Sequence, residues 1–233
     1  TGVAKLMETG RMAIIQNGSP LFKGDAGSGE SNIRGYLLEN DWLEAIIQIP
    51  NDMFYNTGIA TYIWIVSKDK SAERAGKVQL IDASKCCVKR RKPLGNKRNE
   101  FTDDCIKLIT EAYNAFADGV YTNEAGLEVE VKIKQNEDFK YSKVTVEQPL
   151  RDDSGKPVLK KGKPTADASK RDTESIPWSE PIEEYMQKNV YPYAPEAWID
   201  EKKTKIGYEI PFTREFYKYV APRSSEEIFA HLQ

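Results

Sequence analysis

The 233-residue chain is almost neutral, with 34 lysine and arginine residues against 36 aspartate and glutamate residues. This balance excludes a generally basic nucleic-acid-binding surface and an acidic tail, so any contact with nucleic acid requires a local patch. A hydrophobic content of 39% and a charged content of 30% exclude a disordered or fibrous chain and are typical of a folded globular protein.

Cysteine and histidine are scarce. Cys86 and Cys87 are adjacent, Cys105 stands alone, and His231 is the single histidine. These residues provide neither a disulfide framework nor the paired spacing of a metal site, so we expect a reducing, cytoplasmic setting and no bound metal. No signal peptide is evident, and no apolar run approaches the roughly 20 residues of a membrane span. We therefore expect a soluble protein with no membrane partner.

The first elements form a strand–loop–helix pattern. Val3 to Glu8 is typical of a helix end, and Arg11 to Gln16 is predicted to be a strand. Asn17-Gly18 is a turn signal that ends this strand. After a glycine-rich loop, Ser31 to Glu39 carries apolar residues at helical spacing, which predicts an amphipathic helix.

Two nearly continuous apolar runs follow, Leu43 to Ile49 and Thr61 to Val66. Their β-branched and aromatic residues predict neighbouring strands that are buried on both faces of a covered sheet. The intervening loop, Pro50 to Ala60, carries aromatic and small polar residues that a simple connection does not need. Lys77 to Ala83 is one more predicted strand, and Thr102 is expected to cap a helix that ends near Ala117.

The character of the sequence changes after Gly119. Val129 to Val146 mixes short alternating stretches with charges, and Arg151 to Thr173 has almost no apolar residues, which predicts an exposed, mobile loop. The remainder is rich in Trp, Tyr and Pro, and its last predicted helix spans Ser225 to Leu232. We therefore expect one folded unit over residues 1–118 and an irregular extension over residues 119–233.

Three segments carry the most specific motifs of the sequence. They are Gly10 to Phe22, GRMAIIQNGSPLF; Ile49 to Thr61, IPNDMFYNTGIAT; and a C-terminal pair, AWIDE (Ala197 to Glu201) and TKIGYEIPFT (Thr204 to Thr213). Together they resemble the adenine-N6 methyltransferase subunit of type I restriction-modification systems: its fifth strand and following loop, its aromatic loop between the sixth and seventh strands, and a stretch of its C-terminal region. The resemblance implies that residues 1–118 are part of the catalytic domain and that the extension over residues 119–233 contacts other subunits.

The resemblance implies an α/β fold, namely the C-terminal half of a Rossmann-like methyltransferase sheet with an irregular α+β C-terminal extension. In that sheet the last core strand is inserted antiparallel. The resemblance also implies that the S-adenosylmethionine loop and the Asn-Pro-Pro-aromatic catalytic motif lie upstream of Thr1, since neither occurs in this sequence. We therefore expect no catalytic residue in the chain, cofactor binding mainly by the upstream half, and no methylation by this chain alone.

Phe54 is the first candidate site residue. An enzyme that modifies an adenine ring inside a duplex must flip the base out and hold it, and an aromatic face does so by stacking. The resemblance implies that Phe54 holds the target adenine, with Tyr55, Asn56 and Thr57 in support. The alternative is that Phe54 is an ordinary core anchor at the end of a strand.

Two further candidate sites have structural alternatives. Asn17 and Gly18 follow a strand whose carboxyl end faces the ligand-binding cleft in this fold class, but they also suit a plain turn. A basic cluster could neutralise DNA phosphates, although a charged run in a loop can simply be solvated. Its members are Lys89, Arg90, Arg91, Lys92, Lys97 and Arg98.

The sequence thus predicts part of a site-specific DNA adenine-N6 methyltransferase. Its implied partners are double-stranded DNA and the specificity and restriction subunits of the complex. The alternative is a non-catalytic DNA-clamping or assembly module; an unrelated nucleotide-binding protein would require a phosphate-binding glycine loop, which the sequence lacks. Without upstream strands, Met12 to Gln16 should form an exposed apolar edge, and the isolated chain should dimerise, aggregate or need its upstream half.

Overall fold

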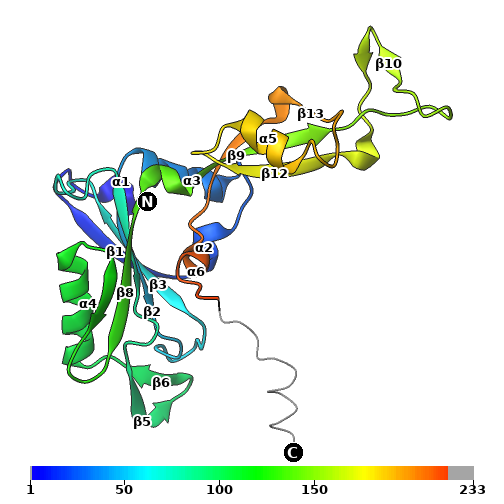
Figure 1. Ribbon diagram of the computed structural model, residues 1–233. Coiled ribbons are helices and arrows are strands. Elements are labelled where there is room, and N and C mark those ends of the chain that lie inside the picture. Colours follow the sequence, from blue (N-terminus) through cyan, green and yellow to red (C-terminus); the bar gives the residue numbers. More distant parts are fainter. Residues whose placement is uncertain (1, 220–233) are drawn as a thin grey trace, which may run out of the picture.

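The computed structural model describes residues 2–219. A mixed six-stranded sheet forms the centre of its main body, in the order β1-β3-β2-β4-β8-β7 (Figure 1). Strand β3 is antiparallel to both β1 and β2, and β4 is parallel to β2. The predicted α/β class and the inserted antiparallel strand are therefore confirmed. The strands are β1 (Arg11–Asn17), β2 (Leu43–Ile49), β3 (Thr61–Ser67), β4 (Lys77–Asp82), β7 (Gly119–Thr122) and β8 (Glu128–Gln135).

The central strands are mostly apolar on both faces because both faces of the sheet are covered. On one face, Ile46 and Leu80 share a core with residues of α3 (Gly29–Glu39). On the other face, Ile47 and Ile81 share a second core with residues of α4 (Asp103–Ala115). Successive strand residues point to opposite faces, which explains why the runs show no polar alternation.

Local sequence signals set the ends of these helices. The Thr102 hydroxyl accepts a hydrogen bond from the Cys105 amide at the start of α4, as predicted, and Phe116 ends that helix in a left-handed conformation. The Ser28 hydroxyl caps α3 through the Ser31 amide. Two short helices, α1 (Gly2–Lys5) and α2 (Ser19–Phe22), flank β1.

A second sheet forms an arm that projects from the body (Figure 1). Its long strand β9 pairs with β12 on one side and with β13 and β14 on the other. Helix α5 packs against it through the buried Met186, beside Val144 and Ile176. These elements are β9 (Lys140–Glu147), β12 (Asp172–Pro177), α5 (Ile182–Asn189), β13 (Trp198–Ile199) and β14 (Lys205–Tyr208).

The expected division after residue 118 differs from the arrangement of the sheets. Strands β7 and β8 follow that residue, yet β8 pairs with β4 and both belong to the six-stranded sheet. The turn η1 (Asn136–Phe139) joins β8 to β9, so the second sheet begins near Lys140. The charged, alternating composition of β8 concealed its place in the main sheet, because one of its faces is half-exposed.

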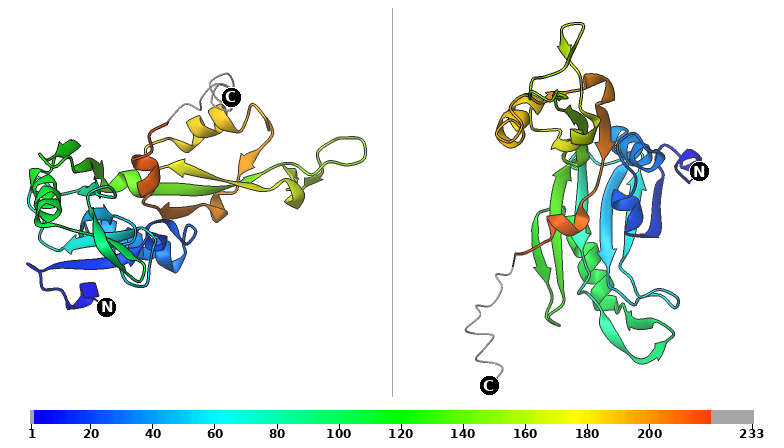
Figure 2. Two further views of the ribbon diagram at one scale, coloured as in Figure 1. Left: turned by 90° about the horizontal axis from the view of Figure 1, so that it is seen from below. Right: turned by 90° about the vertical axis from the view of Figure 1, so that its right-hand side faces the viewer.

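The segment predicted as an exposed loop carries local order. Within it, β10 (Leu159–Lys160) and β11 (Lys163–Pro164) pair as a short hairpin, and η2 (Ala168–Lys170) follows. Figures 1 and 2 place this hairpin at the end of the arm that is distant from the six-stranded sheet. Its residues are exposed, as predicted. The predicted helix from Ser225 to Leu232 lies outside the described residues.

The C-terminal part of the arm returns to the body and is fastened there. The buried Arg34 side chain of α3 donates from Nε to the Tyr208 carbonyl at 2.7 Å, and from one terminal nitrogen to the carbonyls of Pro20 and Lys23. After β14, Ile210 and Phe212 insert into the first core, at the start of α6 (Phe212–Glu215). The guanidinium thus joins three segments that are distant in the sequence.

Strand β1 lies at an edge of the six-stranded sheet. Ile14 and Ile15 are 41% and 51% exposed, so the predicted apolar edge is present among residues 2–219. No helix within these residues is long and apolar enough to cross a membrane.

We predict that Arg34→Met destabilises the protein by roughly 3 kcal/mol, because it removes the donor from the buried Tyr208 carbonyl and from the partly buried carbonyls of Pro20 and Lys23. Methionine keeps most of the apolar stem, so the loss reports mainly on hydrogen bonding. Urea unfolding would measure the change. Arg214→Met, which removes the same charge from an exposed position, is the control; equal unfolding midpoints for the two variants would contradict the assignment.

A second prediction concerns Glu147, whose side chain is 3% exposed and contacts Arg171 and Lys203 at 2.8 Å each. Burial opposes its charge, but the hydrogen bonds from Lys203 and Arg171 outweigh burial and hold the pKa of Glu147 below its usual value. The ionised Glu147 therefore stabilises the fold at pH values above the ordinary pKa of a carboxylate. This stabilisation is lost as the pH falls through the lowered pKa of Glu147. Glu147→Gln should lower the melting temperature more at pH 7 than at pH 3, because the contribution of the carboxylate falls as the pH approaches its lowered pKa. An equal shift at both pH values would contradict this linkage.

Candidate functional site

The carboxyl ends of β1 and β2 meet at one edge of the main sheet. Thr61, the first residue of β3, is the register partner of both Asn17 on β1 and Ile49 on β2. The Asn17-Gly18 turn and the loop of residues 50–60, which we call the aromatic loop, therefore lie next to one another. Open α/β sheets bind ligands at this end of their strands, which we call the carboxyl edge.

The aromatic loop is anchored by buried residues and exposes a tight turn. Met53 is 8% exposed and belongs to the second core, and the half-buried Phe54 ring packs against that core. An isolated bridge joins Phe54 to Thr57 across the turn, while Asn56 lies exposed within it. Tyr55 is 58% exposed. Phe54 is thus partly a core anchor, and Tyr55 presents the more accessible aromatic face.

Local contacts explain why asparagine and glycine occupy the Asn17-Gly18 turn. The Asn17 side-chain oxygen accepts a hydrogen bond from the Ser19 amide at 3.0 Å, and Gly18 is the N-cap of α2 in a right-handed conformation. A Cβ atom at Gly18 would lie 3.2 Å from the Tyr62 ring. The glycine therefore permits close packing of the turn against β3.

The basic cluster lies on a hairpin instead of in the loop that its charge suggested. Strands β5 (Val88–Leu94) and β6 (Lys97–Glu100) pair, and the two-residue turn between them is Gly95-Asn96. Gly95 has a φ of +59°, which suits the first central position of such a turn. All six predicted cationic residues are on these two strands. The exposed ones are Lys89, Arg91, Lys92 and Arg98; Lys97 is half-buried, and Arg90 is paired with Glu100.

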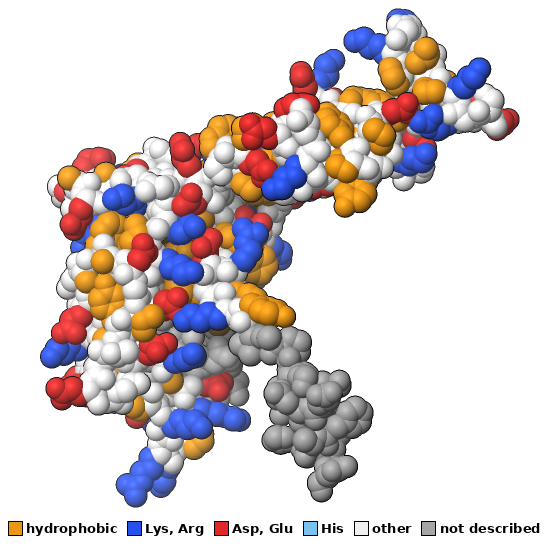
Figure 3. Space-filling view, viewed as in Figure 1, with side chains coloured by type: hydrophobic (Ala, Val, Ile, Leu, Met, Phe, Trp, Pro, Cys, Tyr) orange, Lys and Arg blue, Asp and Glu red, His pale blue; other side chains and the backbone are white. Residues whose placement is uncertain are grey.

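Figure 3 shows lysine and arginine side chains gathered at the lower end of the body, where Figure 1 places β5 and β6. Within this hairpin, Arg90 forms an ion pair with Glu100. The exposed cations therefore form a local positive patch on an otherwise balanced chain, as DNA backbone contact would require.

The structure joins this hairpin directly to the aromatic loop. The amides of Arg98 and Asn99 both donate to the Asp52 carbonyl, at 3.0 and 3.1 Å, and the Asn96 amide donates to the Tyr55 carbonyl at 2.9 Å. The Asn99 side chain also donates to the Asn51 carbonyl at 2.9 Å. Sequence reasoning missed this connection. The Gly95-Asn96 pair was an available hairpin signal, but no local pattern indicates which loop a hairpin contacts.

The cysteines near this edge are core residues. Cys86 and Cys105 are fully buried, and burial, followed by the influence of Cys105, raises the pKa of the Cys86 thiol to about 12. Cys86 therefore remains a neutral thiol at pH 7 and is poorly suited to nucleophilic chemistry. Across residues 2–219, no group of three or more His, Cys, Asp or Glu side chains is arranged to hold a metal ion.

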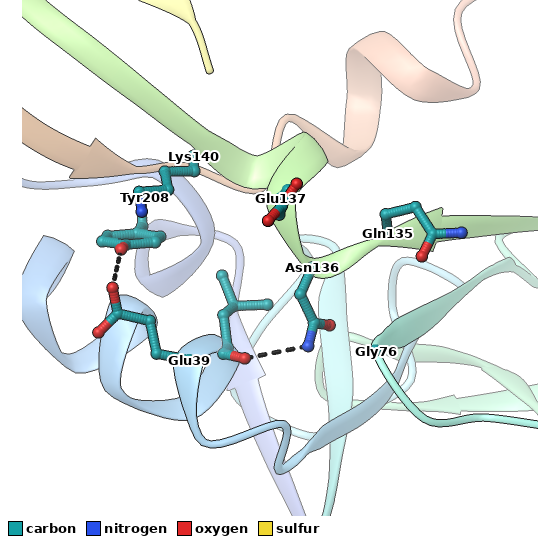
Figure 4. A pocket seen from close by; sticks show the side chains of 8 residues that line it. Glu39, Gly76, Gln135, Asn136, Glu137, Lys140 and Tyr208 are labelled. Atoms are coloured by element: carbon teal, nitrogen blue, oxygen red, sulfur yellow. Dashed lines mark hydrogen bonds between the residues drawn. The ribbon is translucent and has the colours of Figure 1, made fainter. Parts of the chain in front are cut away.

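A polar pocket of about 440 Å³ lies between the body and the arm, near the opposite edge of the sheet (Figure 4). Its polar groups connect the two parts. The Tyr208 hydroxyl donates to the Glu39 carboxylate, and the side-chain amide of Asn136 donates to the Leu38 carbonyl at 3.0 Å. Lys140 lies over the Trp178 ring at 3.8 Å. These contacts hold the arm against the body, so the residues that line the pocket have a structural role.

A larger, mainly apolar groove of about 650 Å³ runs beside β1. Ile14 and Trp64 come from the sheet, Ile33 and Tyr36 come from α3, and Asn17 lies among the lining residues. The groove therefore lies beside the outermost strand, β1, and extends to Asn17 at the carboxyl edge.

Comparison with known proteins adds a family match. Residues 2–152 match the family model described as N-6 DNA Methylase. The methylase subunit of the type I restriction enzyme MjaVIII of Methanocaldococcus jannaschii is 33% identical over 108 residues, which are 46% of this chain and 18% of the relative. The corresponding subunit of MpnII from Mycoplasma pneumoniae is 29% identical over 86 residues, 37% of this chain and 14% of the relative.

One solved structure is that of the type I restriction-modification methyltransferase subunit from Streptococcus thermophilus. It matches with a TM-score of 0.48 and 28% identity, over 59% of this chain and 26% of that chain. The chain spans less than a fifth of the length of the two curated relatives named above.

Proposed function

The chain belongs to the N-6 DNA methylase family, and from that premise we propose that it forms part of a type I restriction-modification methylase subunit. The proposed reaction is transfer of a methyl group to N6 of adenine in double-stranded DNA. The observation that carries the proposal is that the aromatic loop and the basic β5–β6 hairpin are hydrogen-bonded to each other at the carboxyl edge of the sheet.

The two parts of this union suit two different contacts with DNA. Exposed cations on β5 and β6 can neutralise backbone phosphates without reading the sequence. The aromatic loop can hold an adenine that has left the duplex, because stacking on an aromatic ring replaces stacking on neighbouring bases. We propose that Phe54 holds the ring, with Tyr55, Asn56 and Thr57 forming the remainder of the turn around it.

The residues at this edge do not fit a complete S-adenosylmethionine site. The Asn17 side-chain oxygen is already bonded to the Ser19 amide, and Gly18 packs near the Tyr62 ring. Neither residue is part of a glycine-rich turn that could receive the cofactor closely. We therefore derive no step through the cofactor from these side chains, and we propose that parts of the methylase outside this chain bind it for the most part.

We further propose that double-stranded DNA and the specificity and restriction subunits are the partners of the complete assembly, in a cytoplasmic setting that the three free cysteines favour. The arm is the proposed subunit-contacting part. Tyr193 and Trp178 are 88% and 42% exposed, and aromatic residues of this kind are common anchors in protein interfaces.

A second candidate function is a DNA-clamping module without catalysis. The exposed basic hairpin favours it, because phosphate binding requires neither a cofactor nor a flipped base. Only the methylase requires both a cofactor and an aromatic loop that contacts the target adenine.

We predict that Phe54→Leu in a complete methylase lowers the rate of methylation by roughly 5- to 150-fold, as expected from a loss of about 1–3 kcal/mol of base stacking. Leucine keeps much of the packing against the second core but lacks the aromatic face. The measurement is transfer of labelled methyl groups to a duplex with one target adenine, and Phe54→Tyr is the matched control that should retain activity. Full activity of the leucine variant would exclude Phe54 as the stacking residue.

We also predict that replacing Arg91 and Lys92 with alanine weakens DNA binding and makes it less dependent on salt. Each phosphate contact contributes about 0.9 to the slope of log affinity against log salt, so the slope should fall by up to about 1.8. Lys160→Ala with Lys163→Ala removes the same charge from the distant hairpin and serves as the control. Equal slopes for both double variants would place the phosphate contacts elsewhere.

A further inference from the structure

We propose that the β5–β6 hairpin is a positioning device for the aromatic loop, with Gly95 and Asn99 as the positioning residues. In this arrangement one rigid unit receives the DNA backbone on its charged strands and fixes the turn that holds the target adenine. The inference rests on the proposed function of the loop and adds a role for residues that contact neither the base nor the cofactor.

The hydrogen bonds hold the aromatic loop at two places. At its start, the carbonyls of Asn51 and Asp52 accept from the Asn99 side chain and from the amides of Arg98 and Asn99. At its turn, the Tyr55 carbonyl accepts from the Asn96 amide. Asp52 has a φ of +56°, so the loop bends sharply where the hairpin grips it. These bonds restrict the loop on both sides of Phe54.

Gly95 brings the hairpin turn directly against the Tyr55 residue. A Cβ atom at Gly95 would lie 2.8 Å from the Tyr55 carbonyl oxygen and 2.9 Å from its ring. The close approach leaves no room for a side chain between the two turns. The contact requires glycine here, and the positive φ of +59° also favours it.

A loop that is ordered before DNA arrives has a catalytic consequence. A catalytic group that is already in its productive geometry does not have to be ordered in each turnover, and small displacements of such groups reduce rates strongly. Loosening the hairpin should therefore lower kcat more than it alters the KM for DNA, because the charged side chains that attract the backbone remain in place.

The test compares Gly95→Ala with Gly126→Ala. Both glycines have a positive φ, +59° at Gly95 and +74° at Gly126, but a Cβ atom at Gly126 would meet nothing within 4 Å. Both variants thus carry similar backbone strain, and only Gly95→Ala pushes against Tyr55. In the complete methylase, Gly95→Ala should lower kcat at least tenfold with the KM for DNA within twofold, while Gly126→Ala should leave both unchanged.

Amide hydrogen exchange tests the hairpin contact independently of methylation. The amides of Asn96, Arg98 and Asn99 donate to the loop, so their exchange should become at least tenfold faster in Gly95→Ala and remain unchanged in Gly126→Ala. Asn99→Ala should accelerate exchange of the same amides and lower kcat in the same direction. Unchanged exchange in Gly95→Ala, or faster exchange with an unchanged kcat, would overturn the positioning role.

This outcome is distinguishable from failure of the proposed function. If Phe54→Leu retains full methylation, the loop does not hold the adenine, whatever the exchange data show. If Phe54→Leu loses methylation but Gly95→Ala and Asn99→Ala keep their kcat, the loop functions without the hairpin.

Discussion

The insertion of β3 between β1 and β2 determines where the candidate site lies. Because β3 is antiparallel to both neighbours, β1 and β2 run in the same direction and their carboxyl ends meet at Thr61. A hairpin connection from β2 into β3 then leaves the aromatic loop at that edge, beside Asn17. Without this inserted strand, the loop and the turn after β1 would have no common register.

Strand composition shows what the sequence could predict and what it could not. The run from Leu43 to Ile49 was recognisable because burial on both faces demands continuous apolar residues, and the Thr102 cap was recognisable because it satisfies a local amide. Strand β5, VKRRKPL, is mostly exposed, so burial imposed no pattern on it. The contact of the hairpin with residues 51–55 depends mainly on backbone hydrogen bonds donated by Asn96, Arg98 and Asn99, which side-chain patterns do not encode.

Buried polar contacts fix the position of the arm relative to the body. Ser31 and Arg34 on α3 bind the backbone of Tyr208, so the contact depends on two polar residues within an otherwise apolar helix face. Buried polar groups require partners at defined positions, and they therefore fix one relative placement where apolar packing alone would permit several. The TKIGYEIPFT segment supplies this strand and the two core residues that follow it, Ile210 and Phe212.

The two edges of the main sheet use their polar residues differently. At the amino edge, buried Glu44 accepts from the Tyr113 hydroxyl and lies 3.2 Å from Arg11, while Asp41 binds Lys70 and Asn136. Burial and the bond to Glu44 raise the pKa of Tyr113 to about 12, so this contact persists across the physiological range. At the carboxyl edge, loop carbonyls are bonded while the cations and the Tyr55 ring remain exposed. Side chains committed to structural contacts cannot also receive a ligand, so the exposed groups at the carboxyl edge suit the DNA contacts that we propose better than the amino edge does.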